Sequence, residues 1–277
     1  MKRLLLSAFL LLLAVTSLAT GQETEVGKPL PPWTRGTFDI HQISTGRGNS
    51  ALLVFPDGTT LLVDAGSAAD RQPMADTEPR PDATRSPGGW IIQYIERALA
   101  PAAPHLDYAL LTHFHADHMG QVTPATPPSK SGAFRITGLS EVGDAIPIDT
   151  LIDRGADRGS YVRPVDDETW KNYRAFVDEQ VKTRGLKYEP IRVGRNDQIV
   201  LRKDAAAFPT FEVRNVAANG LVWTGTGDEA HSLFPPVETI AKEDLPTENM
   251  CSIGLRIRYG TFDYFTGGDM PGVPEPG

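Results

Sequence analysis

The feature that most constrains the fold of this chain is a run of metal-ligand residue types directly after an apolar segment. The apolar segment covers residues 106–111, and the run that follows reads THFHADH over residues 112–118. In an extended chain, side chains at positions i and i+2 point to the same side, so His113 and His115 can bind one metal together. If the chain then turns, Asp117 and His118 face a second position, about 3.5–4 Å from the first as in two-metal hydrolytic sites. The alternative is a polar loop whose histidines are satisfied by hydrogen bonds.

The ligand types indicate which metal such a site would take. Imidazole and carboxylate groups suit zinc, and they also allow manganese or iron. The pattern therefore predicts a zinc centre at the end of a strand, with two ions in a complete site.

The segments around this run alternate between strand patterns and helix patterns. Period-two alternation or short apolar runs predict strands at residues 37–43, 50–55, 59–63, 106–111, 148–153, 198–202, 211–216, 252–259 and 261–265. Apolar faces at helical spacing predict helices at residues 90–99 and 167–184. Strands that alternate with helices, with ligands at the end of one strand, predict an α/β layered fold.

The N-terminus has the pattern of an export signal. Lys2 and Arg3 precede an apolar stretch over residues 4–15, and residues 17–19 (Ser-Leu-Ala) suit a cleavage site. The apolar stretch is short for a membrane span. We therefore expect a signal peptide over residues 1–19 and a periplasmic or secreted protein, with an uncleaved N-terminal anchor as the alternative.

Composition and charge narrow the remaining possibilities. Residues 20–36 are rich in Pro and Gly and predict a linker, which leaves residues 37–277 as one domain. The formal net charge of −8 gives no support to general nucleic-acid binding. Cys251 is the one cysteine, so no internal disulfide can form, and its apolar surroundings predict a buried structural residue.

Four segments in order resemble the metallo-β-lactamase superfamily. They are residues 44–50 (STGRGNS), 62–66 (LVDAG), 113–118 (HFHADH) and 265–269 (FTGGD). The glycine-flanked opening and residues 249–269 are most similar to the branch that contains the extracellular domain of competence DNA-uptake proteins. The resemblance implies a four-layer αββα sandwich.

The resemblance also implies a role for each ligand. His113 and His115 resemble ligands of a first metal, and Asp117 and His118 resemble ligands of a second. Asp269 resembles the carboxylate that bridges them. The resemblance thus implies two zinc ions that share a hydroxide nucleophile.

Other positions have more than one interpretation. Asp64 resembles the residue that orients the ligands from behind, and its alternative is a turn-capping aspartate. The family usually has a histidine before the strand that precedes the bridging aspartate, where this chain has Glu248 and Asn249. Either residue is a candidate additional ligand, and His231 is a rival.

A second departure concerns the C-terminus. No histidine follows His231, whereas the family has one well beyond the bridging aspartate. We therefore expect the sequence to be incomplete at the C-terminus, or the second metal to lack a ligand.

These observations leave three hypotheses about function. The first is an exported metal-dependent hydrolase acting on a phosphodiester. The second keeps the fold and cleaves an amide or ester, such as a lactam or lactone. The third is a degenerate, non-catalytic metal-binding module, which the missing histidine would favour.

Overall fold

A computed structural model of the chain describes residues 26–68, 80–155 and 165–271. The chain divides into a short unit, Met1–Pro31, and a large compact unit, Pro32–Gly277, and the fold and site below belong to the large unit. The predicted signal peptide lies outside the described residues. Within the described ranges, no helix is long and apolar enough to cross a membrane.

The first sheet carries the strands that deliver the metal-ligand run. In spatial order its strands are β1 (Asp39–Gln42), β2 (Ala51–Val54), β3 (Thr60–Val63), β4 (Leu106–Leu110), β5 (Ile148–Asp153) and β6 (Lys187–Pro190). The first three strands pair antiparallel, and β3 to β6 pair parallel. Because parallel strands end at the same edge, the residues that follow β3, β4 and β5 come together there.

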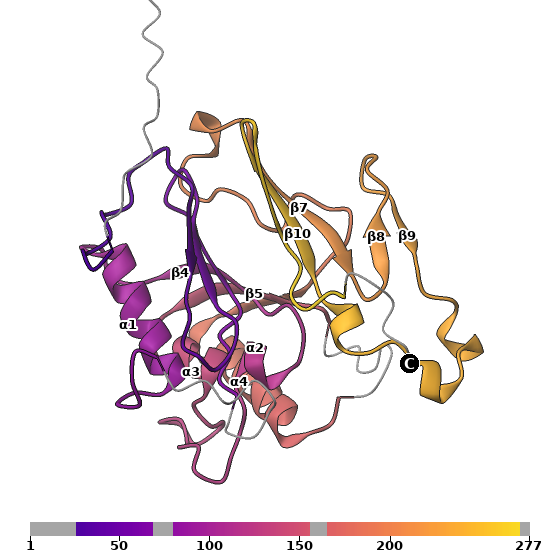
Figure 1. Ribbon diagram of the computed structural model, residues 1–277, viewed down its shortest axis with the longest axis horizontal. Coiled ribbons are helices and arrows are strands. Elements are labelled where there is room, and N and C mark those ends of the chain that lie inside the picture. Colours follow the sequence, from indigo (N-terminus) through magenta and orange to yellow (C-terminus); the bar gives the residue numbers. More distant parts are fainter. Residues whose placement is uncertain (1–25, 69–79, 156–164, 272–277) are drawn as a thin grey trace, which may run out of the picture. The chain divides into compact units, whose positions relative to one another are not determined.

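Helices cover one face of this sheet (Figure 1). They are α1 (Pro87–Leu99), α3 (Gly138–Ala145) and α4 (Glu168–Arg184), while α2 (Ala116–Met119) is a single turn beside them. Ser86 caps α1 by accepting a hydrogen bond from Gly89 N, and Asp167 caps α4 at Trp170 N. Ile95 of α1 and Phe176 of α4 are buried in this layer.

A second sheet packs on the other face of the first. Its strands, in spatial order, are β11 (Phe262–Thr266), β10 (Gly254–Tyr259), β7 (Phe211–Ala218), β8 (Leu221–Trp223) and β9 (Ala230–Ser232), all antiparallel. Leu53 and Leu110 of the first sheet share a buried cluster with Leu255 and Ile257 of the second. Alternate side chains of one strand thus point to the helices and to the second sheet.

The two-sheet α/β architecture confirms the predicted fold class. After α4, the helical segments of the described residues are short 3-10 turns: η2 (Ala205–Ala207), η3 (Val237–Thr239), η4 (Lys242–Asp244) and η5 (Asn249–Cys251). The described part of the chain therefore supplies a helical layer and both sheets.

One predicted strand is wrong, and several elements were not predicted. Residues 198–202 form no strand, although Ile199 and Leu201 are buried as the alternation suggests. Their backbone bonds to side chains instead, because Val200 N donates to Tyr108 Oη and Arg202 N donates to Thr59 Oγ1. The elements without a prediction are α2, α3, β6, β8 and β9, together with the short 3-10 turns.

Candidate metal centre

Strand ends from both sheets meet at the candidate site. Asp64 follows β3, residues 112–118 follow β4, and Asp269 follows β11. Ile253, just before β10, donates its backbone N–H to Thr112 O at 3.0 Å and so joins the second sheet to the first. Residues far apart in the sequence therefore reach one place at the joined edges of the two sheets.

The predicted ligands form one compact cluster. His113 Nε2 lies 3.1 Å from His115 Nδ1. His118 Nε2 lies 3.2 Å from Asp269 Oδ1 and 3.8 Å from Asp117 Oδ2. One nitrogen each of His113 and His118 and one oxygen of Asp269 all lie within 4.8 Å of one another. The structure thus brings all five predicted ligands together.

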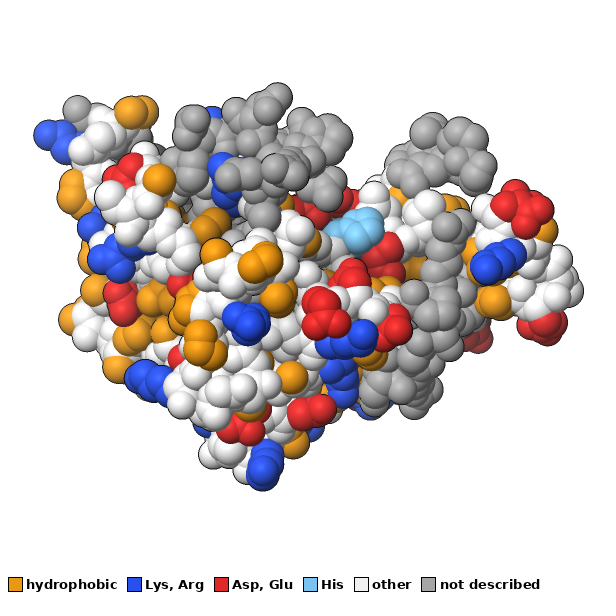
Figure 2. Space-filling model, turned by 90° about the horizontal axis from the view of Figure 1, so that it is seen from below, with side chains coloured by type: hydrophobic (Ala, Val, Ile, Leu, Met, Phe, Trp, Pro, Cys, Tyr) orange, Lys and Arg blue, Asp and Glu red, His pale blue; other side chains and the backbone are white. Residues whose placement is uncertain are grey.

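Burial differs across this cluster. The side chains of His113 and His118 are buried, while His115 is exposed at the start of α2. Figure 2 shows a histidine side chain at the surface with acidic side chains beside it. The cluster therefore has a buried floor and an open side.

Asp64 lies behind the cluster and orients His118. Its side chain is buried, and its backbone φ is 58°, a left-handed conformation that is uncommon outside glycine. Its carboxylate accepts hydrogen bonds from Thr112 N at 2.7 Å and from Thr112 Oγ1 at 2.8 Å. His118 Nδ1 lies 2.8 Å from the same carboxylate. Since a carboxylate only accepts, Nδ1 carries the hydrogen and Nε2 is left as the ligand atom.

The charges of the cluster are arranged for cation binding. Burial, together with the nearby His118 and His115, lowers the pKa of His113 to about 2, so this imidazole is neutral. Burial also acts to lower the pKa of His118, but hydrogen bonds to Asp269 and Asp64 and the charges of Asp64 and Asp117 outweigh it and raise the pKa to about 10. The hydrogen bond from His118 lowers the pKa of Asp269. In the metal-free chain, protonated His118 therefore supplies the positive charge between the carboxylates of Asp64 and Asp269.

The cavity beside the cluster fits a metal as well. It measures about 1160 Å³, and its lining includes His115, Asp117, His118, Asn249 and Asp269. Asn249 Oδ1 is buried and has no hydrogen-bond partner in the described residues. This oxygen could therefore accept a hydrogen bond from a ligand or bind a cation at the cavity. Three imidazoles, two carboxylates and this amide oxygen form a donor set that suits zinc.

The comparisons with known proteins agree with this geometry. The family model of the metallo-beta-lactamase superfamily matches residues 44–190, just over half of the chain. The chain belongs to the metallo-beta-lactamase superfamily. A search of curated proteins found no match. Superfamily membership and the donor cluster together support a metal-dependent hydrolase in general.

The superfamily match covers only part of the site. It includes Asp64 and the ligands from His113 to His118, and it ends before Asp269. The resemblance to the competence-protein branch is not confirmed by it and stays a prediction.

Glu248, predicted as a possible ligand, is occupied elsewhere in the structure. Its Oε1 accepts hydrogen bonds from Phe114 N and Arg154 Nε, each at 2.8 Å, and its Oε2 pairs with Arg154 Nη2 at 2.6 Å. Both side chains of this ion pair are largely buried. Glu248 therefore holds the backbone of the ligand run, between His113 and His115, instead of lining the cavity.

Arg154 is a residue of the site that the sequence pattern did not predict. Beyond its pair with Glu248, it donates to Asn219 Oδ1 at 3.0 Å and lies 4.6 Å from the Phe114 ring centroid. It connects the end of β5, the ligand run and the β7–β8 turn. Its position directly after a parallel strand could have indicated this role, because the residues that follow parallel strands lie together at the site.

The remaining histidines lie apart from the cluster. His231, the rival ligand, is exposed on β9 and lines no part of the metal cavity. His105 forms a second group of potential ligands with Asp107 and Asp149. Asp107 Oδ2 already accepts from Thr60 N and Thr60 Oγ1, so this group has its own structural use.

Two glycines allow the loops at the site to touch. Asn49 N donates to Asp117 O, and Gly66 N donates to Asn49 O. A Cβ on Gly66 would lie 1.8 Å from Asp117 O, and one on Gly48 would lie 2.3 Å from the same atom. The backbone approach that places Asp117 therefore requires glycine at both positions.

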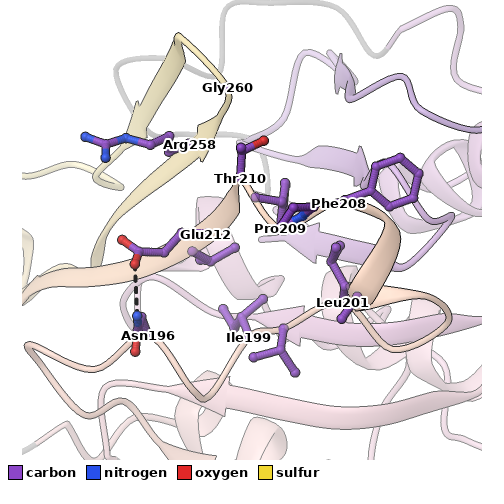
Figure 3. A pocket seen from close by; sticks show the side chains of 13 residues that line it. Asn196, Ile199, Leu201, Phe208, Pro209, Thr210, Glu212, Arg258 and Gly260 are labelled. Carbon is purple, nitrogen blue, oxygen red and sulfur yellow. Dashed lines mark hydrogen bonds between the residues drawn. The ribbon is translucent and has the colours of Figure 1, made fainter.

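A separate cavity of about 630 Å³ lies between residues 196–201 and the start of β7 (Figure 3). Its lining is mainly apolar. Glu212 there accepts from Asn196 Nδ2, and Arg258 pairs with Asp263. Because its polar groups are already paired and it shares no lining residue with the metal cavity, it is not the candidate catalytic site.

Proposed function

We propose that this protein is an exported, zinc-dependent phosphodiesterase. The observation that carries the proposal is the cluster of His113, His115, Asp117, His118 and Asp269 beside one open cavity. Zinc ions bound there would lower the pKa of a water molecule and accept the negative charge that develops on a substrate oxygen. Two ions are expected, since the ligands divide into a pair on each side of Asp269.

The protein's own residues would prepare and hold this site. Asp64 fixes the ring of His118 through Nδ1, and Thr112 fixes Asp64 in turn. Glu248 and Arg154 hold the backbone between the first two ligands. The cluster is therefore preorganised, which saves reorganisation during the reaction.

The phosphodiester assignment draws support from charge. Arg47 and Arg80 line the same cavity in a chain that is acidic overall. A guanidinium binds two phosphate oxygens in its plane, whereas a neutral lactam offers no such partner. Export rests on the N-terminal pattern over residues 1–19 alone.

The direct test measures metal content and turnover together. Elemental analysis of the purified chain should give about two zinc ions per chain, as the two ligand pairs imply. The zinc-loaded chain should hydrolyse bis(p-nitrophenyl) phosphate faster than a panel of lactams and lactones, and His115→Ala should lose this activity. Zinc binding with hydrolysis of lactams alone would refute the phosphodiester assignment, and no hydrolysis at all would favour a non-catalytic module.

Export has a separate test. The full sequence would be expressed in a bacterial host, and the periplasmic fraction would be isolated. N-terminal sequencing should find a chain that begins at Thr20. A chain that keeps Met1 in the membrane fraction would support the uncleaved anchor.

A further inference from the structure

A smaller cavity of about 460 Å³ adjoins the metal cavity. The two cavities share Ser44 and Arg80 in their linings, so one ligand can reach into both. The smaller cavity lies between the segment after β1 and one side of α1, which contributes Trp90, Gln93 and Arg97. We propose that it binds a second anionic group of the substrate, with Arg80 and Arg97 as its cationic contacts. This inference rests on the proposed phosphodiesterase function.

The charge of the cavity carries the first step. In the described part of the chain, neither Arg80 nor Arg97 has a carboxylate partner, and the cavity lining contains no acidic residue. Several other arginines of this acidic chain do pair with carboxylates, as Arg256 does with Asp263 and Arg195 does with Asp197. Two unpaired guanidinium groups at one cavity favour an anion as their partner.

A buried hydroxyl provides the second step. Thr45 lines the cavity and is 2% exposed as a residue, yet its Oγ1 has no hydrogen-bond partner among the described residues. A buried hydroxyl without a partner is costly unless a ligand or water completes it. Thr45 O accepts from Arg80 N at 2.9 Å, which fixes the two residues beside each other. A bound acceptor group would satisfy the hydroxyl and one guanidinium together.

The aromatic residues of the cavity are held in place already. Trp90 Nε1 donates to Asp82 O at 3.0 Å, and the Tyr94 hydroxyl lies 3.1 Å from His41 Nδ1. These two aromatic side chains are therefore fixed before any ligand binds. The substrate class that fits both cavities is a phosphodiester with a second phosphate close to the scissile one.

A pair of matched substrates tests the inference. Thymidine 5′-(p-nitrophenyl phosphate) would be compared with the same ester carrying a 3′-phosphate, using the zinc-loaded full chain. The added phosphate should raise kcat/KM by about tenfold, mainly through KM, since hydrogen bonds to ionised groups are the strong ones. The ratio between the two substrates should fall toward one in Arg97→Gln and in the double variant Arg80→Gln/Arg97→Gln. Lys182→Gln, which removes an exposed charge on α4, should keep the wild-type ratio.

A binding measurement separates this inference from the proposed function. Calorimetry with thymidine 3′,5′-bisphosphate on the zinc-loaded chain should show weaker binding, by about tenfold, in Arg97→Gln than in Lys182→Gln. If neither ester is hydrolysed but binding still depends on Arg97, the phosphodiesterase proposal fails and the anion site stands. If binding and the substrate ratio are the same in all variants, the anion site is refuted whatever the turnover.

Discussion

At the scale of single residues, the site depends on Asp64. Its backbone adopts a left-handed conformation that costs an Asp residue energy, and it does so inside the protein. Hydrogen bonds from Thr112, His118 and Asn49 converge on its carboxylate and offset that cost. A residue that touches no substrate thus determines which nitrogen of His118 faces the cavity.

Replacing Asp64 by Asn should therefore weaken metal binding. The amide offers His118 a neutral acceptor in place of a carboxylate, and loss of such a supporting partner typically costs 10–100-fold in affinity. Competition with a chromophoric zinc chelator would measure the change. Asp263→Asn, an exposed carboxylate on β11, is the control and should bind zinc like the wild type. Unchanged affinity in Asp64→Asn would contradict the orienting role.

The raised pKa of His118 gives a pH dependence with a defined sign. Its folded pKa of about 10 lies above the ordinary value of 6.5, so in the metal-free chain this residue stabilises the fold at low pH and loses that contribution as pH rises through 10. Between pH 7 and 9 a metal at Nε2 must displace the proton. Zinc affinity should therefore rise with pH in this range, with proton release. Calorimetry in buffers of different ionisation enthalpy measures the release, and zinc binding without it would contradict the assignment.

At the scale of elements, the sequence predicts what depends on local pattern. Residues 254–259 alternate with period two and form β10, and Asp167 and Gly185 delimit α4 as capping rules expect. The pattern fails at residues 198–202, where buried alternation persists but the backbone bonds to side chains of β4 and of the β2–β3 turn. The tertiary structure determines these hydrogen-bond partners, so the local sequence pattern cannot predict them.

The candidate site likewise has one part that the local sequence predicts and one part that only the tertiary structure determines. The cluster from His113 to His118 was predictable because its ligands lie within one short run at a strand end. The use of Glu248 was not, since only the fold places Arg154 and the Phe114 backbone against it. The sequence alone does not distinguish a carboxylate that binds the metal from one, such as Glu248, that pairs with an arginine.

The contact between the loop at Gly66 and the loop at Asp117 predicts that Gly66→Ala lowers both stability and zinc affinity. The new Cβ would lie 1.8 Å from Asp117 O, so the two loops must separate. Overpacking of this kind typically costs about 1–3 kcal/mol and occasionally more, and here it should also lower zinc affinity. Gly254→Ala is the control, because its Cβ would meet no atom nearer than 3.4 Å. Denaturant unfolding and zinc titration of both variants would measure the effects, and equal behaviour would contradict the close approach.

The buried ion pair between Arg154 and Glu248 predicts a loss of stability when the arginine is replaced. Arg154→Gln would leave the Glu248 carboxylate buried without its cation, and breaking such a pair typically costs about 3–5 kcal/mol. Urea unfolding of the metal-free chain should show this loss. Arg195→Gln removes the exposed ion pairs with Asp197 and Asp228 and should change the midpoint little. If Arg154→Gln unfolded at the wild-type midpoint, the pair would have no structural role.

At the scale of the whole molecule, the cluster of candidate ligands joins the two sheets. His118 follows a strand of the first sheet, and Asp269 follows a strand of the second. Zinc should therefore raise the melting temperature, by a stabilisation of about 4 kcal/mol at a free zinc concentration 1,000 times the Kd. Thermal unfolding with and without a chelator would measure this shift. The double variant His113→Ala/His115→Ala should show a much smaller shift, and a shift of equal size would place the bound zinc elsewhere.

The hydrogen bond between Ile253 and Thr112 has a consequence for how the protein is made. It closes a very long loop of chain, and contacts of that kind form late and slowly. The ribosome synthesises the first sheet with its histidines well before β10 and β11 exist. During that interval the histidines have no Asp269 and no second sheet to cover them. We therefore expect metal binding that requires Asp269 to occur only after the second sheet has formed, and the compartment in which folding finishes to determine which metal the chain acquires.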